Sequence, residues 1–238
     1  MPGAVHDRSD TVEVLRETRI FGSLTDENLE RLAEVCTSRT FGRGQYLWYQ
    51  GDEGDRLLVV VSGLLKVVMS SAQGDEVVLT TLGRSETVGE LAVLDGSPRS
   101  ASVIAVEPTT VLMLTRPTVV GLMSRHPAVL DGMLRSLGQL VRRLSEQTGD
   151  LMHLDLAGRL AKAFLRLAQD HTVGEQAMGS PVVLDLGLSQ SDLAAMVGAT
   201  RPAVNRVLQH FVARGLIAVD GQVILLRDLP GLRRRAES

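Results

Sequence analysis

Hydrophobic residues in the first half of the chain gather in short runs that alternate with glycine-containing turns. The runs are QYLWYQ, RLLVVV, LLKVVM, EVVLTTL, SASVIAV and TVLML, between residues 45 and 114. Such spacing indicates the strands of a sandwich or closed roll, and Trp48 is expected in its core. Ahead of them, residues 25–36 place Leu29, Leu32 and Cys36 on one face, which predicts a short amphipathic helix with a buried cysteine.

After Pro127 the apolar period becomes helical. Residues spaced alternately by four and three positions form an apolar seam: Leu130, Leu134, Leu137, Val141, Leu144, Thr148 and Leu151. This is the a/d pattern of a coiled coil over three heptads. A helix buried in a monomeric core would show the same stripe. The rest of this segment is strongly polar, which favours pairing with a second copy and predicts a symmetric dimer.

The last third of the chain predicts an amphipathic helix, a loop over 171–181, two short helices and two strands. The first of these helices opens at Asp155, and Ser189 is a good N-cap for SDLAAMV. Gly198 ends that helix, and Thr200 caps the next one, whose first turn tolerates Pro202.

This second short helix buries an apolar stripe and leaves Arg201, Asn205 and Arg206 on its outer face. A generic helical hairpin would explain the apolar spacing alone. A winged helix-turn-helix also explains the short glycine turn, the capped second helix and the hairpin at Asp220-Gly221. In that motif arginine can pair with guanine and asparagine with adenine in the major groove.

Composition narrows the class of protein. Hydrophobic residues make up 44% of the 238 residues, and no apolar run approaches the ~18 residues of a membrane span. Residues 1–10 lack the apolar region of a signal peptide. The only cysteine, Cys36, excludes intrachain disulfides and cysteine-based metal sites. We therefore expect a cytoplasmic protein without membrane association, cofactor or metal.

The net charge of −3 is unevenly distributed. Residues 1–149 contain 15 Lys and Arg against 19 Asp and Glu, whereas residues 150–238 contain 10 against 9. The asymmetry is mild, and it permits DNA binding by the second part without proving it. Catalytic Ser/His/Asp, Cys/His or metal-ligand spacings are not recognised, so an enzyme is not expected.

Candidate binding chemistry concentrates in residues 89–102, GELAVLDGSPRSAS. Gly89 allows the backbone to approach a ligand, and the following turn can direct N–H groups at an anion. Arg99 offers a fork of donors for phosphate oxygens, and Ser100 and the Ala101 N–H can complete a phosphate cradle. Glu90 can accept a hydrogen bond from a ribose hydroxyl. The alternative is a surface Glu–Arg pair on a glycine-rich turn.

This run resembles the phosphate-binding cassette of the cyclic-nucleotide-binding domain family, with G-E-L-A followed by P-R-x-A. The resemblance implies that Glu90 binds the ribose 2′-hydroxyl and that Arg99 and Ser100 bind the cyclic phosphate. Leu79 and Leu82 would help to wall the pocket. The candidate ligand-binding residues are Leu79, Leu82, Gly89, Glu90, Leu91, Ala92, Arg99, Ser100, Ala101, Leu144 and Ser145.

Residues 20–228 as a whole resemble the cyclic-AMP receptor protein / fumarate–nitrate regulator (CRP/FNR) superfamily, and the stretch GDLMHLDLAGRLAKAFLRLA carries much of the likeness. The resemblance places Asp155 at the hinge. Two departures stand out: Pro202 replaces an acidic base-reading residue, and Leu144 replaces a hydroxyl residue that touches adenine, whereas Ser145 matches. The candidate DNA-binding residues are Ser189, Gln190, Thr200, Arg201, Asn205 and Arg206.

The sequence thus predicts an α+β protein with three parts. They are an N-terminal helix and cyclic-nucleotide-binding β-roll (1–126), a long dimerisation helix (127–154) and a winged helix-turn-helix (155–238). The predicted function is a homodimeric transcription regulator of palindromic promoter sites, with double-stranded DNA, RNA polymerase and a cyclic nucleotide, cAMP in the first place, as partners. Alternatives are a regulator of the same fold with a degenerate pocket, which is constitutively active or senses another effector, and a regulatory subunit or interaction module without DNA binding.

Overall fold

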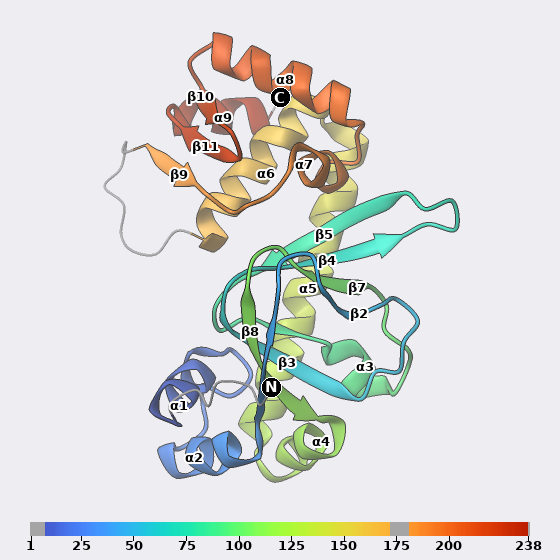
Figure 1. Ribbon diagram of the computed structural model, residues 1–238, viewed down its shortest axis with the longest axis vertical. Coiled ribbons are helices and arrows are strands. Elements are labelled where there is room, and N and C mark those ends of the chain that lie inside the picture. The colour runs from blue at the N-terminus through green and yellow to red at the C-terminus, as the bar shows by residue number, and fades with distance from the viewer. Residues whose placement is uncertain (1–7, 172–180, 238) are drawn as a thin grey trace. The chain divides into compact units, whose positions relative to one another are not determined.

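The computed structural model describes residues 8–171 and 181–237, and the chain divides into two compact units, Met1–Arg143 and Leu144–Ser238. The first unit contains two four-stranded antiparallel sheets (Figure 1). One has the order β1-β8-β3-β6 and the other β2-β7-β4-β5. The strands are β1 (Thr37–Phe41), β2 (Tyr46–Trp48), β3 (Arg56–Ser62), β4 (Leu65–Ser70), β5 (Glu76–Leu82), β6 (Thr87–Val88), β7 (Ser102–Ala105) and β8 (Thr109–Thr115).

Strand β3 is buried on both faces and shows how the roll is packed. Leu57, Val59 and Val61 belong to the core shared with the helices, whereas Leu58 and Val60 belong to the core between the sheets. Successive side chains of a strand point to opposite faces, so the run RLLVVV supplies both cores at once. A strand between two cores, such as β3, therefore requires a continuous apolar run rather than an alternating one.

Helices close one end of the roll (Figure 1). They are α1 (Arg8–Glu17), α2 (Asp26–Val35) and α4 (Arg116–Arg125), and they bury side chains in the same core as the first turns of α5 (Pro127–His153). Thr25 caps α2 through Asn28, and Thr115 caps α4 through Thr118. Cys36 ends α2 and is partly buried against this core, which raises the pKa of its thiol to about 12. The prediction of a short helix before the roll is thus confirmed.

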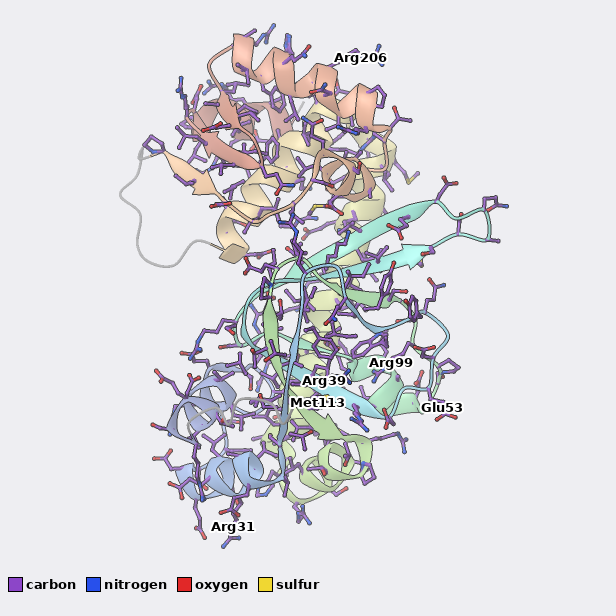
Figure 2. The ribbon with its side chains drawn as sticks, viewed as in Figure 1. Arg31, Arg39, Glu53, Arg99, Met113 and Arg206 are labelled. Atoms are coloured by element: carbon purple, nitrogen blue, oxygen red, sulfur yellow. The ribbon has the colours of Figure 1, made fainter. Side chains whose placement is uncertain are left out.

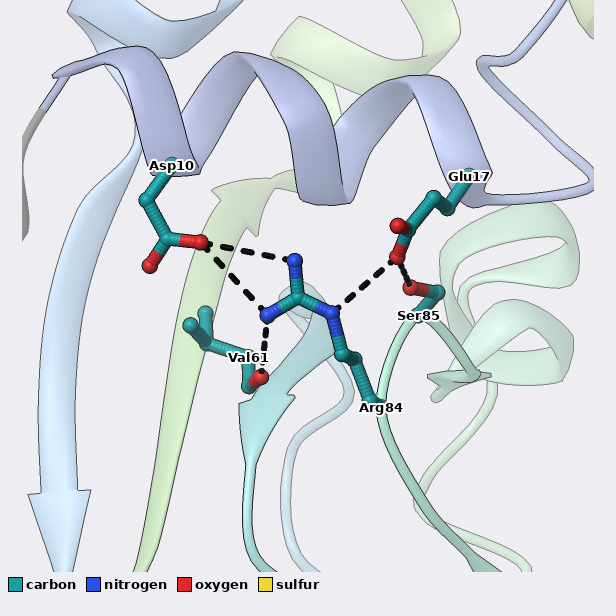
Figure 3. Close-up of polar contacts among 5 residues, drawn as sticks. All are labelled: Asp10, Glu17, Val61, Arg84 and Ser85. Carbon is teal, nitrogen blue, oxygen red and sulfur yellow. Dashed lines mark hydrogen bonds and ion pairs between the residues drawn. The ribbon is translucent and has the colours of Figure 1, made fainter. Parts of the chain in front are cut away.

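A cluster of polar contacts fixes α1 to the roll (Figure 3). The Arg84 guanidinium lies 3.1 Å from a Glu17 carboxylate oxygen and 3.4 Å from an Asp10 carboxylate oxygen, and it donates to the Val61 carbonyl at 3.1 Å. Ser85, with a φ of +64°, also donates to Glu17. Because all the charged groups are partly exposed, the cluster orients α1 more than it stabilises the fold.

Helix α5 presents two different faces. Val129, Gly132 and Met133 are buried in the first unit. The apolar seam is exposed in the single chain: Leu134 is 56% and Val141 62% exposed, and Leu130, Leu144 and Leu151 are also exposed. Leu137, also in the seam, is partly buried. No described helix, including this long one, is long and apolar enough to cross a membrane.

The second unit begins inside α5, and its described residues form four further helices and a three-stranded sheet of order β10-β11-β9. The elements are α6 (Leu156–His171), β9 (Val182–Leu184), α7 (Gln190–Met196), α8 (Arg201–Ala213), β10 (Ile217–Asp220), β11 (Val223–Leu226) and α9 (Leu229–Ala236). Val204, Leu208 and Phe211 of α8 are buried, as the predicted stripe requires.

The predicted fold class is confirmed: a roll of strands, a long helix and a winged helix-turn-helix are all present. Seven of the described elements were not predicted, namely α1, β1, β6, α3 (Glu90–Asp95), α4, β9 and α9. The loop expected at 171–181 lies almost entirely outside the described residues, and β9 begins directly after Pro181. The boundary between the two compact units, at Arg143 and Leu144, lies within α5. The N-terminal part of this helix therefore belongs to the first unit and its C-terminal part to the second.

Candidate functional site

The cassette begins at Gly89, which connects β6 to the short helix α3 (Glu90–Asp95). Gly89 has a φ of +100°, in the left-handed region that favours glycine. A Cβ at this position would lie 2.5 Å from Nη1 of Arg99 and 2.8 Å from the Arg56 carbonyl oxygen. Glycine is therefore needed both for the turn and to let the Arg99 side chain lie against the backbone.

Arg99 is buried, with 5% of its surface exposed. Its Nη2 donates to the Arg56 carbonyl at 2.7 Å and its Nη1 to the Gly89 carbonyl at 3.4 Å. Its Nε is buried without a hydrogen-bond partner in the described part of the chain. Burial lowers the pKa of Arg99, and the nearby charges of Asp55 and Asp52 oppose that shift. The site therefore holds a desolvated cation whose donors are only partly used.

One face of the Arg99 guanidinium lies against Trp48, with 3.8 Å between Cζ and the ring centroid. The indole Nε1 donates to the Ala101 carbonyl at 2.9 Å, and the ring packs against the core between the sheets. Trp48 was predicted to be a core residue. It does pack against the core, but it also contacts Arg99 of the cassette, which was not predicted. The signal that it also contacts the cassette is absent from the local sequence, because about fifty residues separate it from Arg99.

Glu90 is the first residue of α3 and is partly buried. Its carboxylate accepts a hydrogen bond of 3.4 Å from the Ser136 hydroxyl of α5. Desolvation raises the pKa of Glu90 above the ordinary value, while hydrogen bonds from its own and the Gly89 backbone, from Ser136, and the charge of Arg99 act in the opposite direction. Ser136 was not predicted, and it links the cassette directly to α5.

The other predicted ligand residues are distributed around this centre. Ala92, Ala101 and Leu82 are buried, Leu79 is partly buried on β5, and Leu91 and Ser100 are exposed. Leu144 and Ser145 are exposed residues of α5 and belong to the second unit. The structure thus brings Gly89, Glu90, Arg99 and Ala101 together. A ligand-binding role stays a prediction for these four residues and for the others.

A second link runs from α5 to the roll. Arg143 donates through Nη1 to the Thr80 hydroxyl of β5, between the predicted pocket residues Leu79 and Leu82. Sequence reasoning treated Arg143 only as part of the polar surface of the helix. The contact joins residues 63 positions apart, so no local pattern could have indicated it.

The predicted DNA-binding residues lie on α7 and α8. Ser189 caps α7 in a capping box with Asp192, and Gln190 begins that helix. Gly198 adopts a φ of +61° in the turn between the helices. Thr200 occupies the N-cap position of α8, but its side chain makes no capping hydrogen bond. Thr200 thus lies at the predicted N-cap position, and its exposed hydroxyl forms no capping bond to the helix.

Arg201, Asn205 and Arg206 are all exposed on α8, and Figure 2 shows Arg206 on the outer side of this helix. The spacing of four residues places Arg201 and Asn205 on one face of the helix, and Arg206 is the next residue along the chain. They come from the first two turns, and the hairpin of β10 and β11 follows α8 as a wing. This geometry fits a helix whose N-terminal half enters a groove of DNA.

Asp155, the predicted hinge residue, precedes α6. Its carboxylate accepts a hydrogen bond of 2.8 Å from the Gly158 N–H and forms an ion pair with Arg235 of α9. The Gly158 hydrogen bond, with Arg235 contributing less, lowers the pKa of Asp155. Asp155 thus fixes the start of α6, and the unpredicted α9 takes part in that arrangement.

Comparison with known proteins assigns both units. Residues 38–126 match the cyclic nucleotide-binding domain family, and residues 158–235 match the Crp-like helix-turn-helix domain family. The chain is 31% identical over 224 residues to the CRP-like cAMP-activated global transcriptional regulator of Mycobacterium tuberculosis, covering 94% of this chain and 99% of that protein. It is 28% identical to the cyclic AMP receptor protein of Thermus thermophilus, covering 90% and 94%.

Among solved structures, a CRP/FNR-family transcriptional regulator from Thermus thermophilus superposes with a TM-score of 0.70 at 26% identity. The superposition covers 85% of this chain and 99% of that one. The two domain matches, the relative of 31% identity and this structure agree with the architecture described above. The chain therefore belongs to the CRP/FNR family and is a DNA-binding transcription regulator with a cyclic nucleotide-binding domain.

Proposed function

We propose that this regulator is a homodimer whose binding to palindromic promoter DNA is controlled by cAMP in the cassette. The observation that carries the ligand assignment is the state of Arg99. A guanidinium that is almost completely buried, with an unused Nε and no carboxylate within ion-pair distance among the described residues, is costly unless an anion completes the site. The cyclic phosphate of a nucleotide supplies that anion.

The remaining cassette residues suit the sugar and the phosphate. The Glu90 carboxylate, partly buried beside Gly89, would accept a hydrogen bond from the ribose 2′-hydroxyl. Ser100 and the Ala101 N–H would add donors to the phosphate. Leu79 and Leu82 would line the pocket, and Leu144 and Ser145 would approach the base. The Mycobacterium relative is named a cAMP-activated regulator and the Thermus relative a cyclic AMP receptor protein, which supports this nucleotide as the effector.

Coupling to DNA binding would run through α5. The Ser136–Glu90 hydrogen bond and the Arg143–Thr80 contact attach this helix to the cassette and to β5. A ligand that rearranges Glu90 therefore changes the interactions of the helix that carries the apolar seam. Such a change regulates DNA binding only if the ligand binds one arrangement of the helices more tightly than the other.

The uncovered seam of α5 supports the dimer. Its apolar side chains recur with coiled-coil spacing along the helix and are exposed in one chain. A symmetric pair would present two copies of α8, and Arg201, Asn205 and Arg206 would read two half-sites about one helical turn apart. Ser189, Gln190 and Thr200 would contact phosphates. Transcription regulation further implies contact with RNA polymerase. It also implies that the protein is located with the DNA, in the bacterial cytoplasm.

A regulator that responds to another effector is the second candidate. The favouring observation is Leu144, an apolar, exposed side chain that cannot hydrogen-bond an adenine amine. The phosphate and ribose contacts would then be kept while the base contact differs. Parallel titrations with cAMP and cGMP separate this candidate from the first.

Isothermal calorimetry of Arg99→Ala tests the ligand assignment. Loss of a charge-assisted contact to a phosphate should weaken cAMP binding by about a hundredfold. Arg39→Ala is the matched control, because Arg39 also lies over an aromatic ring, that of Phe41, but is exposed and outside the cassette (Figure 2). Equal affinities of the wild type and Arg99→Ala would refute the assignment.

A further inference from the structure

Trp48 is held rigidly in relation to the cassette. It lies in β2, opposite Val103 of β7, and an irregularity in the strand register occurs between Tyr46 and Trp48. Its indole N–H is bonded to the Ala101 carbonyl, two residues after Arg99. The ring is therefore anchored to the segment that carries the arginine, as well as to the core between the sheets.

The guanidinium of Arg99 has few other fixed partners. It makes one good hydrogen bond, to the Arg56 carbonyl at 2.7 Å, and one long hydrogen bond, to Gly89 at 3.4 Å. Neither partner carries a charge. The Trp48 ring, 3.8 Å from Cζ, offers the negative face of a π-system, which attracts a cation and is well suited to the planar guanidinium.

Gly89 lies close to both the guanidinium and the ring. A Cβ added to Gly89 would lie 2.5 Å from Arg99 Nη1 and 3.3 Å from Cη2 of Trp48. The backbone of Gly89 thus packs against both the guanidinium and the ring. The arginine has little room to adopt another orientation while Trp48 is in place.

We propose that Trp48 is a positioning residue for ligand binding: its ring holds the Arg99 guanidinium in the orientation that receives the phosphate. The inference rests on the proposed function, since it takes Arg99 as the phosphate-binding group. Preorganisation increases affinity because an ordered side chain loses less conformational freedom when the ligand arrives. The ring also makes a buried, incompletely bonded cation tolerable before binding.

Two variants of Trp48 separate the contribution of the ring face from that of the indole N–H. Trp48→Leu removes both, whereas Trp48→Phe removes only the hydrogen bond to Ala101 and keeps an aromatic face. If Trp48 acts by positioning Arg99, Trp48→Leu should weaken cAMP binding about tenfold, and Trp48→Phe should restore most of that loss. Tyr49→Leu is the matched control, because Tyr49 is exposed and stacks on Tyr46. Its affinity should equal that of the wild type.

A double-mutant cycle distinguishes positioning from a general structural effect. In the Arg99→Ala background, Trp48→Leu should change cAMP affinity by less than twofold, because the group that the ring positions is absent. A tenfold loss in both backgrounds, or equal losses for the Phe and Leu variants, would overturn the inference. Calorimetry provides the affinities, and circular dichroism identifies variants that do not fold.

Fluorescence of the wild type provides a test that needs no substitution. Trp48 is the only tryptophan in the chain, so its emission reports on the surroundings of Arg99 alone. Arrival of a phosphate at the guanidinium should change this emission with the same midpoint as the calorimetric titration. Binding of cAMP without any change in emission would contradict the inference and leave the proposed function intact. A wild type that binds no cyclic nucleotide would refute both.

Discussion

Replacing Leu134 by aspartate should convert the proposed dimer into monomers without unfolding the chain. Leu134 is 56% exposed in the single chain, so its side chain contributes little to the fold of one protomer. In a parallel pair, the seam position of one α5 faces the same position of the other. The variant would therefore place two carboxylates opposite each other in an apolar contact.

The magnitude follows from the exposed fraction. Complete burial of a leucine side chain is worth about 1.5–3 kcal/mol, so burial of the exposed half contributes about 1 kcal/mol in each protomer. The substitution loses that contribution twice and adds the cost of desolvating two like charges, about 1 kcal/mol or more for each. A total of about 4 kcal/mol corresponds to roughly a thousandfold weaker association.

Sedimentation equilibrium of the wild type, Leu134→Asp and Arg135→Asp would measure this effect. Arg135 is the neighbouring residue, is exposed and lies outside the seam, so Arg135→Asp should remain dimeric. Circular dichroism should show equal helix content in all three proteins. The reasoning fails if Leu134→Asp associates as tightly as the control, or if the wild type is monomeric at micromolar concentration.

Three further substitutions test the hinge, the DNA-binding helix and the base contact. Asp155→Ala should cost about 1 kcal/mol through loss of an N-cap. Because hydrogen bonding lowers the pKa of Asp155, this stability is present above the ordinary carboxyl pKa of about 4 and disappears as the pH falls through the lower folded value. Thermal melts should therefore show a difference in melting temperature between the variant and the wild type that becomes smaller in acid. A difference that does not change with pH would contradict this role of the Asp155 carboxylate. Arg206→Ala should lose about 1–3 kcal/mol at one base pair and relax specificity there in competition gel shifts, whereas Arg214→Ala, at the far end of α8, should not. Leu144→Thr should improve the preference for cAMP over cGMP by about fivefold, the worth of one neutral hydrogen bond; a wild type that already discriminates by orders of magnitude would show that another group reads the base.

The architecture was predictable where a local pattern determines the structure. Glycine-separated apolar runs predicted the roll, the alternation of four- and three-residue spacings predicted α5, and Ser189 and Gly198 marked the limits of α7. Each signal lies within one continuous segment, the longest being the three heptads of α5, and reflects backbone or periodicity requirements. Strand β9 was missed because three residues give no measurable period.

The site was predictable only in part, because its geometry depends on contacts between distant segments. The spacing of Glu90 and Arg99 identified the cassette through its resemblance to a family. Trp48, Ser136 and Arg143 come from a separate strand and from α5, and no spacing rule connects them to the cassette. Helix α1 is a different case, since Thr11, Val14 and Leu15 do follow a helical spacing that could have predicted it.

Affinity for promoter DNA, with and without cAMP, tests the central claim most directly. Fluorescence anisotropy with a labelled duplex that carries an inverted repeat, identified by footprinting, would provide both dissociation constants at one salt concentration. We predict that saturating cAMP tightens binding at least tenfold and that Arg99→Ala loses this response while still binding DNA weakly. Equal affinities with and without cAMP would contradict regulation by this nucleotide, and the absence of any protected inverted repeat would contradict dimeric recognition.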